Sequence, residues 1–293
     1  MKDQGHKDTF FSGKHSLNCR GKLLDLSRPA VMGILNVTPD SFFDGGKYTE
    51  APALSHRISQ MIEEGVDIID VGAMSTRPGS SPVTKDLELQ RLSEAIGIIR
   101  SNYPDIPISV DTCRAEVAGK AIVDFKVDMV NDITAGGESE EMFDVIAELN
   151  VPYIIMHMQG NPSTMQKNPH YHDVVDDILF FLANKVASLR KKGVVDIVVD
   201  PGFGFGKTVE HNYQLLAHLN VFRSLELPIL AGLSRKSMIS GFLNIDSDNA
   251  LNGTTALNMF ALVQGSSILR VHDVKEAVET RNLFCKLRES ALL

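Results

Sequence analysis

The chain has 293 residues, of which 43% are hydrophobic, so it is long and apolar enough to bury one sizeable core. Its formal net charge of −8 argues against a nucleic-acid or anionic-membrane partner, because such partners are recognised by basic surfaces. The three cysteines lie far apart without C-x-x-C spacing, which predicts reduced thiols in a cytoplasmic protein. The first residues carry charges and no apolar run approaches about 18 residues, so we expect neither a signal peptide nor a membrane span.

Residues 1–28 are predicted to form a short N-terminal arm or hairpin that closes one face of the domain. The domain itself is predicted to cover 29–293, because no linker, low-complexity tract or change in composition divides that stretch. Its first strand begins at Met32 and ends abruptly in Asn36, before a Pro-, Asp- and Gly-rich loop. This pattern is typical of a buried strand that delivers an amide side chain to its carboxyl end.

The same pattern of an apolar run with a polar side chain recurs along the rest of the chain. The polar residues are Asp70, Asp111, Asn131, His157, Asp200, Lys236, and Arg270 with His272. Amphipathic segments of helical length lie between these runs. The predicted helices cover 51–65, 85–101, 114–126, 139–149, 173–192, 209–224, 249–264 and 273–288.

Strands that alternate with helices and are apolar throughout predict a parallel sheet that is buried on both faces. An open doubly wound sheet could have the same alternation. In an open sheet, however, functional residues concentrate at one switch point, whereas here nearly every strand contributes a polar group. This even distribution favours an α/β fold with a single closed (β/α)8 TIM barrel, in which all eight strand ends meet at one mouth.

Several motifs that would indicate other chemistry are incomplete or missing. DPGFGFGKT at residues 200–208 looks like a phosphate loop, but a Walker A motif requires glycine where this chain has Pro201. No G-x-G-x-x-G opens a predicted helix, which argues against a Rossmann nucleotide site. The chain also lacks H-E-x-x-H, paired cysteine ligands and a G-x-S-x-G elbow, so neither a zinc site nor a serine hydrolase is expected.

Asp111, Asn131 and Asp200 place short hydrogen-bonding side chains at strand ends. A carboxylate can accept two parallel bonds from a ring N–H and an adjacent exocyclic amine, the edge that guanine-like heterocycles present. The structural alternative is that each residue only caps a loop or the next helix. Three such groups at one mouth favour a heterocycle site.

Positive charge for a phosphate-type group could come from Arg77 and from Arg270 with His272. The alternative for a lone arginine is a surface salt bridge. The Pro-Gly-Ser-Ser sequence after Arg77 instead indicates a flexible loop that could close over a substrate.

Eight segments, in order from about residue 20 to 290, together resemble the dihydropteroate synthases. They are GILNVTPDSFFDGG, STRPG, VDT, VND, MHMQGNP, DPGFGFGK, GLSRKSM and RVHDV. The resemblance implies a barrel that condenses 6-hydroxymethyl-7,8-dihydropterin pyrophosphate with p-aminobenzoate. The products would be 7,8-dihydropteroate and pyrophosphate, in folate biosynthesis.

The resemblance also implies roles for individual residues, in a homodimer. The pterin would contact Asp111, Asn131, Met156, Asp200, Phe205, Gly232 and Lys236. The pyrophosphate would contact Asn36, Arg77, Arg270 and His272, and Asn36 would also bind Mg²⁺. The p-aminobenzoate would contact Phe42, Thr76, Pro78, Phe205 and Ser237. The catalytic set would be Asn36, Lys236, Arg270 and His272.

Modest departures from the family pattern occur in two loops. Ala73 and Met74 precede STRPG where many relatives carry a small residue and an acid, and Phe43 replaces a common serine. Neither change touches an implied pterin or pyrophosphate ligand. We therefore expect effects on inhibitor sensitivity or loop closure and not on substrate identity.

The chemistry implied by the resemblance requires no strong base, because an arylamine is largely neutral at pH 7. The demanding step is the expulsion of pyrophosphate, which needs charge neutralisation by a metal, Arg and His. We favour a dissociative substitution, and a concerted displacement stays open. Since the loops 38–46 and 74–82 cannot pack a core alone, we expect p-aminobenzoate to bind appreciably only after the pterin pyrophosphate, or with pyrophosphate present.

Three other functions would need different residues. A pterin-binding methyltransferase that uses methyltetrahydrofolate and a corrinoid would not need Arg270 with His272 or the TPDSF and STRPG loops. A non-catalytic pterin-binding paralogue would be expected to lose Asn36, Lys236 or Arg270, and all three are present. An aldolase-type barrel would place its Schiff-base lysine within a strand, whereas Lys236 follows Ser234 and Arg235 in a predicted loop.

Overall fold

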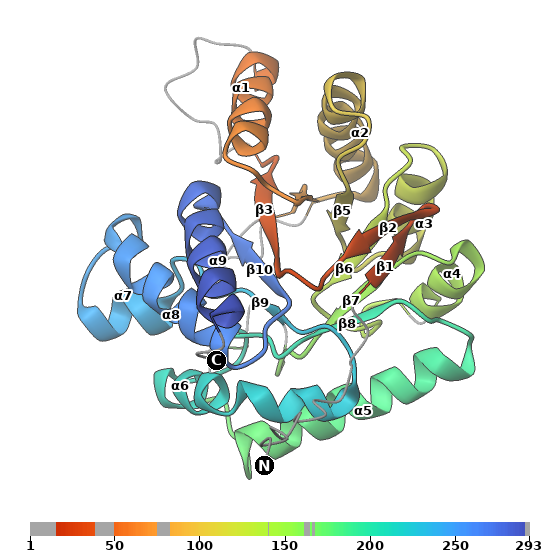
Figure 1. Cartoon of the computed structure of the whole chain (residues 1–293). Helices are drawn as coiled ribbons and strands as arrows, with labels where there is room; N and C mark the ends of the chain where they lie inside the picture. The colour runs from red at the N-terminus through yellow and green to blue at the C-terminus, as the bar shows by residue number, and fades with distance from the viewer. Residues whose placement is uncertain are drawn as a thin grey trace, which may run out of the picture.

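The computed structural model describes residues 16–38, 50–74, 83–139, 141–160, 165 and 168–290. Within these ranges, eight parallel strands form one sheet in the order β8-β7-β6-β5-β4-β3-β10-β9 (Figure 1). They are β3 (Ala30–Asn36), β4 (Ile68–Gly72), β5 (Ile108–Asp111), β6 (Met129–Asp132), β7 (Tyr153–Met156), β8 (Ile197–Asp200), β9 (Leu230–Ala231) and β10 (Ile268–Val271). A parallel bridge between Val199 and Ile229 joins the two ends of this order. The predicted (β/α)8 barrel is therefore confirmed, and the open sheet is excluded.

Helices surround the sheet and connect successive strands (Figure 1). They are α1 (Glu50–Glu63), α2 (Lys85–Asn102), α3 (Ala115–Val123), α4 (Met142–Leu149), α5 (Val174–Lys191), α6 (Val209–Ala217), α7 (Ser237–Leu243), α8 (Leu251–Val263) and α9 (Val274–Glu289). The 3₁₀ turns η2 (Leu219–Leu225) and η3 (Ser247–Asn249) complete the set in this part of the chain. None of the helices in the described ranges is long and apolar enough to cross a membrane.

Two helical segments differ from the prediction. The single helix expected over 209–224 is α6 followed by η2, with a break at His218, where the backbone N–H bonds the carbonyls of Gln214 and Leu216. Helix α7 was not predicted. It has seven residues, and such a short segment spans too few turns to give a helical period.

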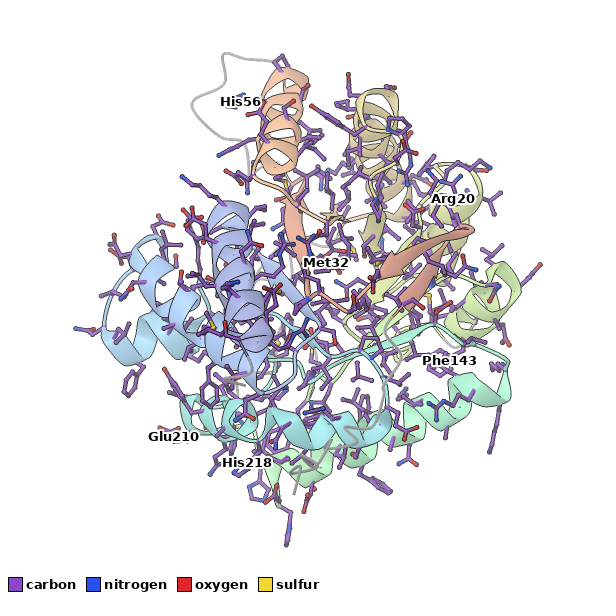
Figure 2. The ribbon with its side chains drawn as sticks, viewed as in Figure 1. Arg20, Met32, His56, Phe143, Glu210 and His218 are labelled. Atoms are coloured by element: carbon purple, nitrogen blue, oxygen red, sulfur yellow. The ribbon has the colours of Figure 1, made fainter. Side chains whose placement is uncertain are left out.

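The predicted hairpin closes the end of the barrel where the strands begin. β1 (Ser16–Cys19) and β2 (Lys22–Asp25) pair antiparallel, and the turn places Arg20 and Gly21 at positive φ, as a tight hairpin requires. Leu17, Cys19 and Leu26 of this segment are buried against the first inward-facing residues of the strands. Figure 2 shows Met32, one of these residues, inside the ring of helices. The boundary between 1–28 and 29–293 stays a prediction.

Close packing holds α1 and α9 against β3. Gly33 faces these helices, and a Cβ at this position would lie 2.3 Å from Cε of Met61 and 3.0 Å from side-chain atoms of Val66 and Val274. Only glycine therefore fits here without movement of the core. This packing fixes the strand whose last residue is Asn36.

Candidate active site

The alternation of side chains along each strand builds the mouth of the barrel. Inside the barrel, one apolar layer contains Ile68, Met129, Ile154, Val198, Leu230 and Ile268. Because side chains two residues apart share a face, the next inward positions are Asp70, Asn131, Met156, Asp200, Gly232 and Arg270. Five of these six positions belong to the predicted pterin or pyrophosphate set. The apolar layer separates them from the hairpin at the opposite end.

Strand register pairs four positions with one another across neighbouring strands. Asn36 pairs with Gly72, Gly72 pairs with Asp111, and Asp111 pairs with Asn131 across β3 to β6. A Cβ on Gly72 would lie 3.3 Å from Oδ1 of Asn36 and 3.5 Å from Cβ of Asp111. The small residue therefore lets an amide and a carboxylate approach one another at the mouth.

Arg270 is held by two carboxylates from distant parts of the sequence. Its Nε donates to Oδ2 of Asp70 at 2.7 Å, and its Nη2 donates to Oδ2 of Asp111 at 2.6 Å. Asn131 Nδ2 donates to the same oxygen of Asp70 at 3.1 Å. One cation, two carboxylates and an amide from β4, β5, β6 and β10 thus form one connected group.

The charges in this group depend on each other. Burial alone would lower the pKa of Arg270, but the carboxylates of Asp70 and Asp111 outweigh it, and the pKa is raised. Burial raises the pKa of Asp111 to about 7, although Arg270 opposes this shift, while Asp70 adds to it. Arg270 therefore stays charged, whereas Asp111 can change its protonation state near neutral pH.

Asp70 was not part of the predicted site. It is fully buried, and its Oδ1 atom has no hydrogen-bond partner among the described residues. The signal was present in the sequence, because a carboxylate inside an otherwise apolar strand must find a partner. Its place beside Arg270 makes it a positioning residue for that guanidinium.

Asp200 occupies the opposite side of the mouth, at the end of β8. It pairs in register with Met156, and its Oδ1 accepts a 2.7 Å bond from the backbone N–H of Gly202. Burial raises the pKa of Asp200, while Lys236, the Gly202 N–H and Arg270 each act in the opposite direction. The carboxylate is therefore buried, with three cations, Lys236, Arg270 and Lys207, close enough to stabilise its ionised form.

Lys236 is held by the loop that follows Asp200. Its Nζ donates to the carbonyl of Phe203 and lies 4.8 Å from the ring centre of Phe205. Burial lowers its pKa to about 8, with Asp200 raising it and Arg270 lowering it further. Nζ also lies 3.7 Å from the position that a Cβ on Gly232 would take, so the ammonium lies directly beside this glycine.

The segment that carries Lys236 differs from the predicted strand. β9 contains only Leu230 and Ala231, and Lys236 is the N-cap of α7. Arg235 before it has φ of 56° and binds Asp273 through Nε at 3.0 Å and Nη2 at 2.6 Å. Ser237 is the exposed first residue of α7. A tight turn, and not a long strand, therefore delivers the lysine to the mouth.

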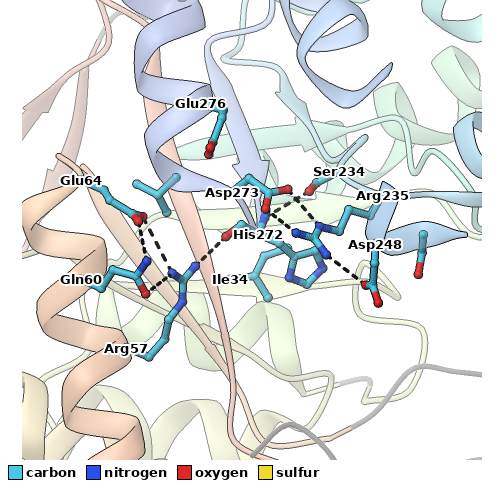
Figure 3. Close-up of a pocket in the computed structure, with 12 residues that line it drawn as sticks. Ile34, Arg57, Gln60, Glu64, Ser234, Arg235, Asp248, His272, Asp273 and Glu276 are labelled. Carbon is cyan, nitrogen blue, oxygen red and sulfur yellow. Dashed lines mark hydrogen bonds and ion pairs between the residues drawn. The ribbon is translucent and has the colours of Figure 1, made fainter. Parts of the chain in front are cut away.

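His272 follows β10 and lines a cavity of about 620 Å³ between α1 and the start of α9 (Figure 3). Arg57 on α1 donates through Nη2 to the backbone carbonyl of His272 at 2.6 Å, and the His272 N–H donates to Ser234 Oγ at 3.2 Å. Burial and the neighbouring Arg270 lower the pKa of His272 to about 4. In this state the imidazole is neutral, so it offers a hydrogen bond and not the positive charge expected from the sequence.

Four predicted site residues lie outside the described residues, namely Phe42, Thr76, Arg77 and Pro78. The chain on either side of 75–82 is held from α2 and α3. Arg91 Nη1 donates to the carbonyl of Ala73 at 3.1 Å, and Arg114 Nη2 donates to the carbonyl of Val83 at 2.8 Å. Glu88 in turn accepts from Arg114 at 2.7 Å.

The donor set suits a weakly held metal. Asn36 presents one neutral amide oxygen at the end of β3, close to Asp111. Within the described ranges, no group of three His, Cys, Asp or Glu side chains could hold a metal ion. A single neutral oxygen can hold a divalent cation only together with waters or with oxygens from a ligand such as a phosphate group.

Comparison with known proteins identifies the family. The sequence profile of the family described as pterin binding enzyme matches residues 32–272. A dihydropteroate synthase from Escherichia coli is 43% identical over 265 residues, which cover 90% of this chain and 93% of the relative. The chain belongs to the dihydropteroate synthase family.

Solved structures of this family share the fold of the chain. Dihydropteroate synthase from Xanthomonas albilineans with 4-aminobenzoic acid has a TM-score of 0.87 and 38% identity, covering 94% of this chain and 98% of that chain. The same enzyme in complex with 7,8-dihydropteroate has a TM-score of 0.83 and 36% identity, covering 93% of this chain and 98% of that chain. The chain therefore shares its fold with solved structures whose ligands are 4-aminobenzoic acid and 7,8-dihydropteroate.

Proposed function

We propose that the mouth of this barrel binds 6-hydroxymethyl-7,8-dihydropterin pyrophosphate and p-aminobenzoate and joins them, releasing pyrophosphate. Membership of the dihydropteroate synthase family supports this reaction and, more broadly, the role of a transferase in folate biosynthesis. The observation that carries it is the single mouth where Arg270, Asp111, Asn131, Asp200 and Lys236 meet. Together these groups offer hydrogen-bond partners for the edge of a heterocycle and positive charge for a phosphate-type group.

The pterin is proposed to lie deepest, where the side chains are shortest and most buried. Asp200 would accept hydrogen bonds from the ring N–H and exocyclic amine, and Asn131 and Asp111 would bond the remaining edge. Arg270 engages only Oδ2 of Asp111, so the other oxygen can serve a ligand. The predicted set for this pocket is Asp111, Asn131, Met156, Asp200, Phe205, Gly232 and Lys236.

The pyrophosphate is proposed to lie between β3 and β10, against Asn36, Arg270 and His272, with Arg77 added from the loop. Arg270 remains charged at all relevant pH values because two carboxylates raise its pKa. Asn36 would contribute one oxygen to Mg²⁺, which when bound neutralises charge on the diphosphate. The protein would therefore hold the metal weakly unless diphosphate is present.

The p-aminobenzoate slot is proposed to lie above Phe205 and Ser237, with Phe42, Thr76 and Pro78 from the two loops. The neutral amine of p-aminobenzoate forms a bond to the exocyclic methylene carbon of the pterin, and the bond from that carbon to the pyrophosphate oxygen breaks. The amine then loses one proton. Asp200, Lys236 and Arg270 would orient the pterin and stabilise the charges that develop, by several kcal/mol in total. We favour the dissociative path, since the electron-rich dihydropterin can carry positive charge.

We further propose a cytoplasmic homodimer. The helices α7, α8 and α9 pack side by side at one edge of the barrel (Figure 1). Large apolar side chains on these helices and just after α7 are exposed, namely Phe242, Leu243, Ile245, Phe260, Val263, Leu283 and Leu287. Exposed apolar side chains that form a contiguous patch are characteristic of protein interfaces. Analytical ultracentrifugation should show a dimer for the wild type. The substitution Phe242→Lys should convert it to a monomer, because the side chain of Phe242 is 66% exposed in the single chain.

The deciding experiment measures pyrophosphate release. We expect release only when p-aminobenzoate, the dihydropterin pyrophosphate and Mg²⁺ are all present, with loss on chelation and recovery on adding Mg²⁺. Binding of pterin without any release would indicate the non-catalytic paralogue. Methyl transfer from methyltetrahydrofolate to a corrinoid would indicate the methyltransferase, and either result would refute the proposal.

A further inference from the structure

Lys207 is a buried lysine that the proposed reaction does not use. It is only 3% exposed, and none of the described carboxylates forms an ion pair with it. Its Nζ donates instead to the carbonyls of Gly202 at 2.7 Å and Phe205 at 3.0 Å. The same atom lies 3.2 Å from Nδ1 and 3.4 Å from the carbonyl of His157. A single ammonium therefore joins the loop after β8 to the loop after β7.

Two glycines let these loops approach so closely. A Cβ on Gly202 would lie 1.9 Å from the carbonyl oxygen of His157, and one on Gly206 would lie 2.6 Å from that of Gln159. Both glycines also have positive φ, which a larger residue would strain. Tyr171 adds a bond from its hydroxyl to the carbonyl of Gly206 at 2.7 Å. The loop 201–207 is thus pressed against the β7 loop along its length.

The same loop contacts the proposed pterin lysine on its other side. Lys236 Nζ donates to the carbonyl of Phe203 and lies over the ring of Phe205. Phe205 therefore contributes its carbonyl to Lys207 and its ring to Lys236. Any change in the cage around Lys207 must move groups that place Lys236.

We propose that Lys207 is a positioning residue, which fixes the loop 201–207 in the conformation that places Lys236 for the pterin. The inference rests on the proposed function for its consequence, whereas the effect on the loop stands on geometry alone. A buried ammonium without a carboxylate costs free energy, and methionine of similar length would avoid that cost. Burial lowers the pKa of Lys207 to about 7, with Asp200 raising it and Lys236 lowering it further. The lysine is therefore retained at a cost to stability, as expected for a group that organises a site.

The first test follows the loop itself. Hydrogen exchange of the backbone amides of residues 202–207 should be at least tenfold faster in Lys207→Met than in the wild type. Val186→Ala, which truncates a buried side chain of α5 that makes no bond to either loop, is the control for a general loss of stability. Equal exchange in wild type and Lys207→Met, or equal acceleration in the control, would overturn the proposal. If the methionine variant does not fold, Lys207→Gln replaces it in this test, because the glutamine side chain keeps two N–H donors without the charge.

The second test is a double-mutant cycle with Lys236→Met, read by calorimetry with 6-hydroxymethylpterin. Lys207→Met should weaken binding at least tenfold in the wild type and less than about threefold when Lys236 is already methionine. Val186→Ala should leave the affinity unchanged. Equal losses in both backgrounds would show a merely structural lysine and overturn the proposal. If the wild type binds no pterin, the proposed function fails, while the exchange result still decides the role of Lys207 in the loop.

Discussion

The two sides of the barrel mouth hold their cations in opposite ways. On the β4, β5 and β10 side, Arg270 is bound by the carboxylates of Asp70 and Asp111. On the β7 and β8 side, Lys207 and Lys236 are bound by backbone carbonyls. The arginine pKa is raised, whereas burial lowers the lysine pKa values to about 7 and about 8.

This difference indicates two kinds of function. A guanidinium paired with carboxylates keeps its charge under all conditions, which suits the binding of a diphosphate that always carries charge. A lysine held mainly by carbonyls, whose pKa is lowered by burial, can lose its proton near neutral pH. The charge on the loop side therefore depends on pH, while the charge of Arg270 stays constant.

Replacement of Arg270 should have the largest effect, because it leaves two carboxylates buried without their cation. Arg270→Met is expected to abolish activity and to lower the free energy of unfolding by about 3–5 kcal/mol at pH 7. Denaturant unfolding at pH 7 and pH 5 measures this loss, which should shrink at pH 5 as the carboxyl of Asp111 gains a proton, because burial raises the pKa of that group to about 7. Lys236→Met provides the matched comparison, and an equal loss of stability in that variant would remove the distinction between the two sides.

Asp200 should matter for the ligand far more than for the fold. Asp200→Ala is expected to weaken pterin binding at least 100-fold, since two bonds to a charged group contribute about 1.5–3 kcal/mol each. The free energy of unfolding should change little, because the carboxylate accepts one backbone bond, from Gly202, and its burial is unfavourable. Calorimetry and denaturant unfolding test both parts, and wild-type pterin affinity would refute the assignment.

The affinity for pterin should fall at acid pH because of Asp111. Burial raises its pKa to about 7, so below this pH the carboxyl gains a proton and the oxygen that faces the ligand becomes a weaker acceptor. Affinity for 6-hydroxymethylpterin should fall by up to about tenfold per pH unit below pH 7. Asp111→Asn should bind more weakly and show no such slope between pH 5.5 and 7. A slope that persists in the variant would assign the fall in affinity to another group.

The sequence was sufficient to predict the barrel and much of its mouth. Short apolar runs with polar ends placed Asp111, Asn131 and Asp200 on one rim, because strand alternation is a local property. The partners of these residues were not predictable. Asp70 and Arg270 lie 200 positions apart, and no periodicity reveals that they meet.

Two further features escaped prediction for different physical reasons. Lys207 was considered only as part of an incomplete phosphate loop, since a cage of backbone carbonyls leaves no pattern in side-chain types. His272 was expected to carry positive charge, but burial beside Arg270 lowers its pKa to about 4. Both outcomes depend on tertiary packing and not on the local sequence.

A smaller effect concerns stability at alkaline pH. The pKa of Lys236 in the folded protein is about 8, below its usual value of 10.5, so the folded state binds fewer protons than the unfolded state between these values. The free energy of unfolding should therefore rise with pH in this window, by up to about 1.4 kcal/mol per pH unit relative to Lys236→Met. Denaturant unfolding from pH 8 to 9.5 measures the difference. Parallel curves for the two proteins would contradict the lowered pKa.

The contrast between the two sides is tested most directly by nuclear magnetic resonance of protein with isotope-labelled lysine side chains, titrated from pH 6 to 11. Two lysines should titrate near pH 7 and pH 8, and their signals should disappear in Lys207→Met and Lys236→Met respectively. Lysine signals that are unchanged in both variants serve as internal controls. If Lys207 and Lys236 also titrated near 10.5, both would be charged like Arg270, and the difference between the two sides of the mouth would not exist.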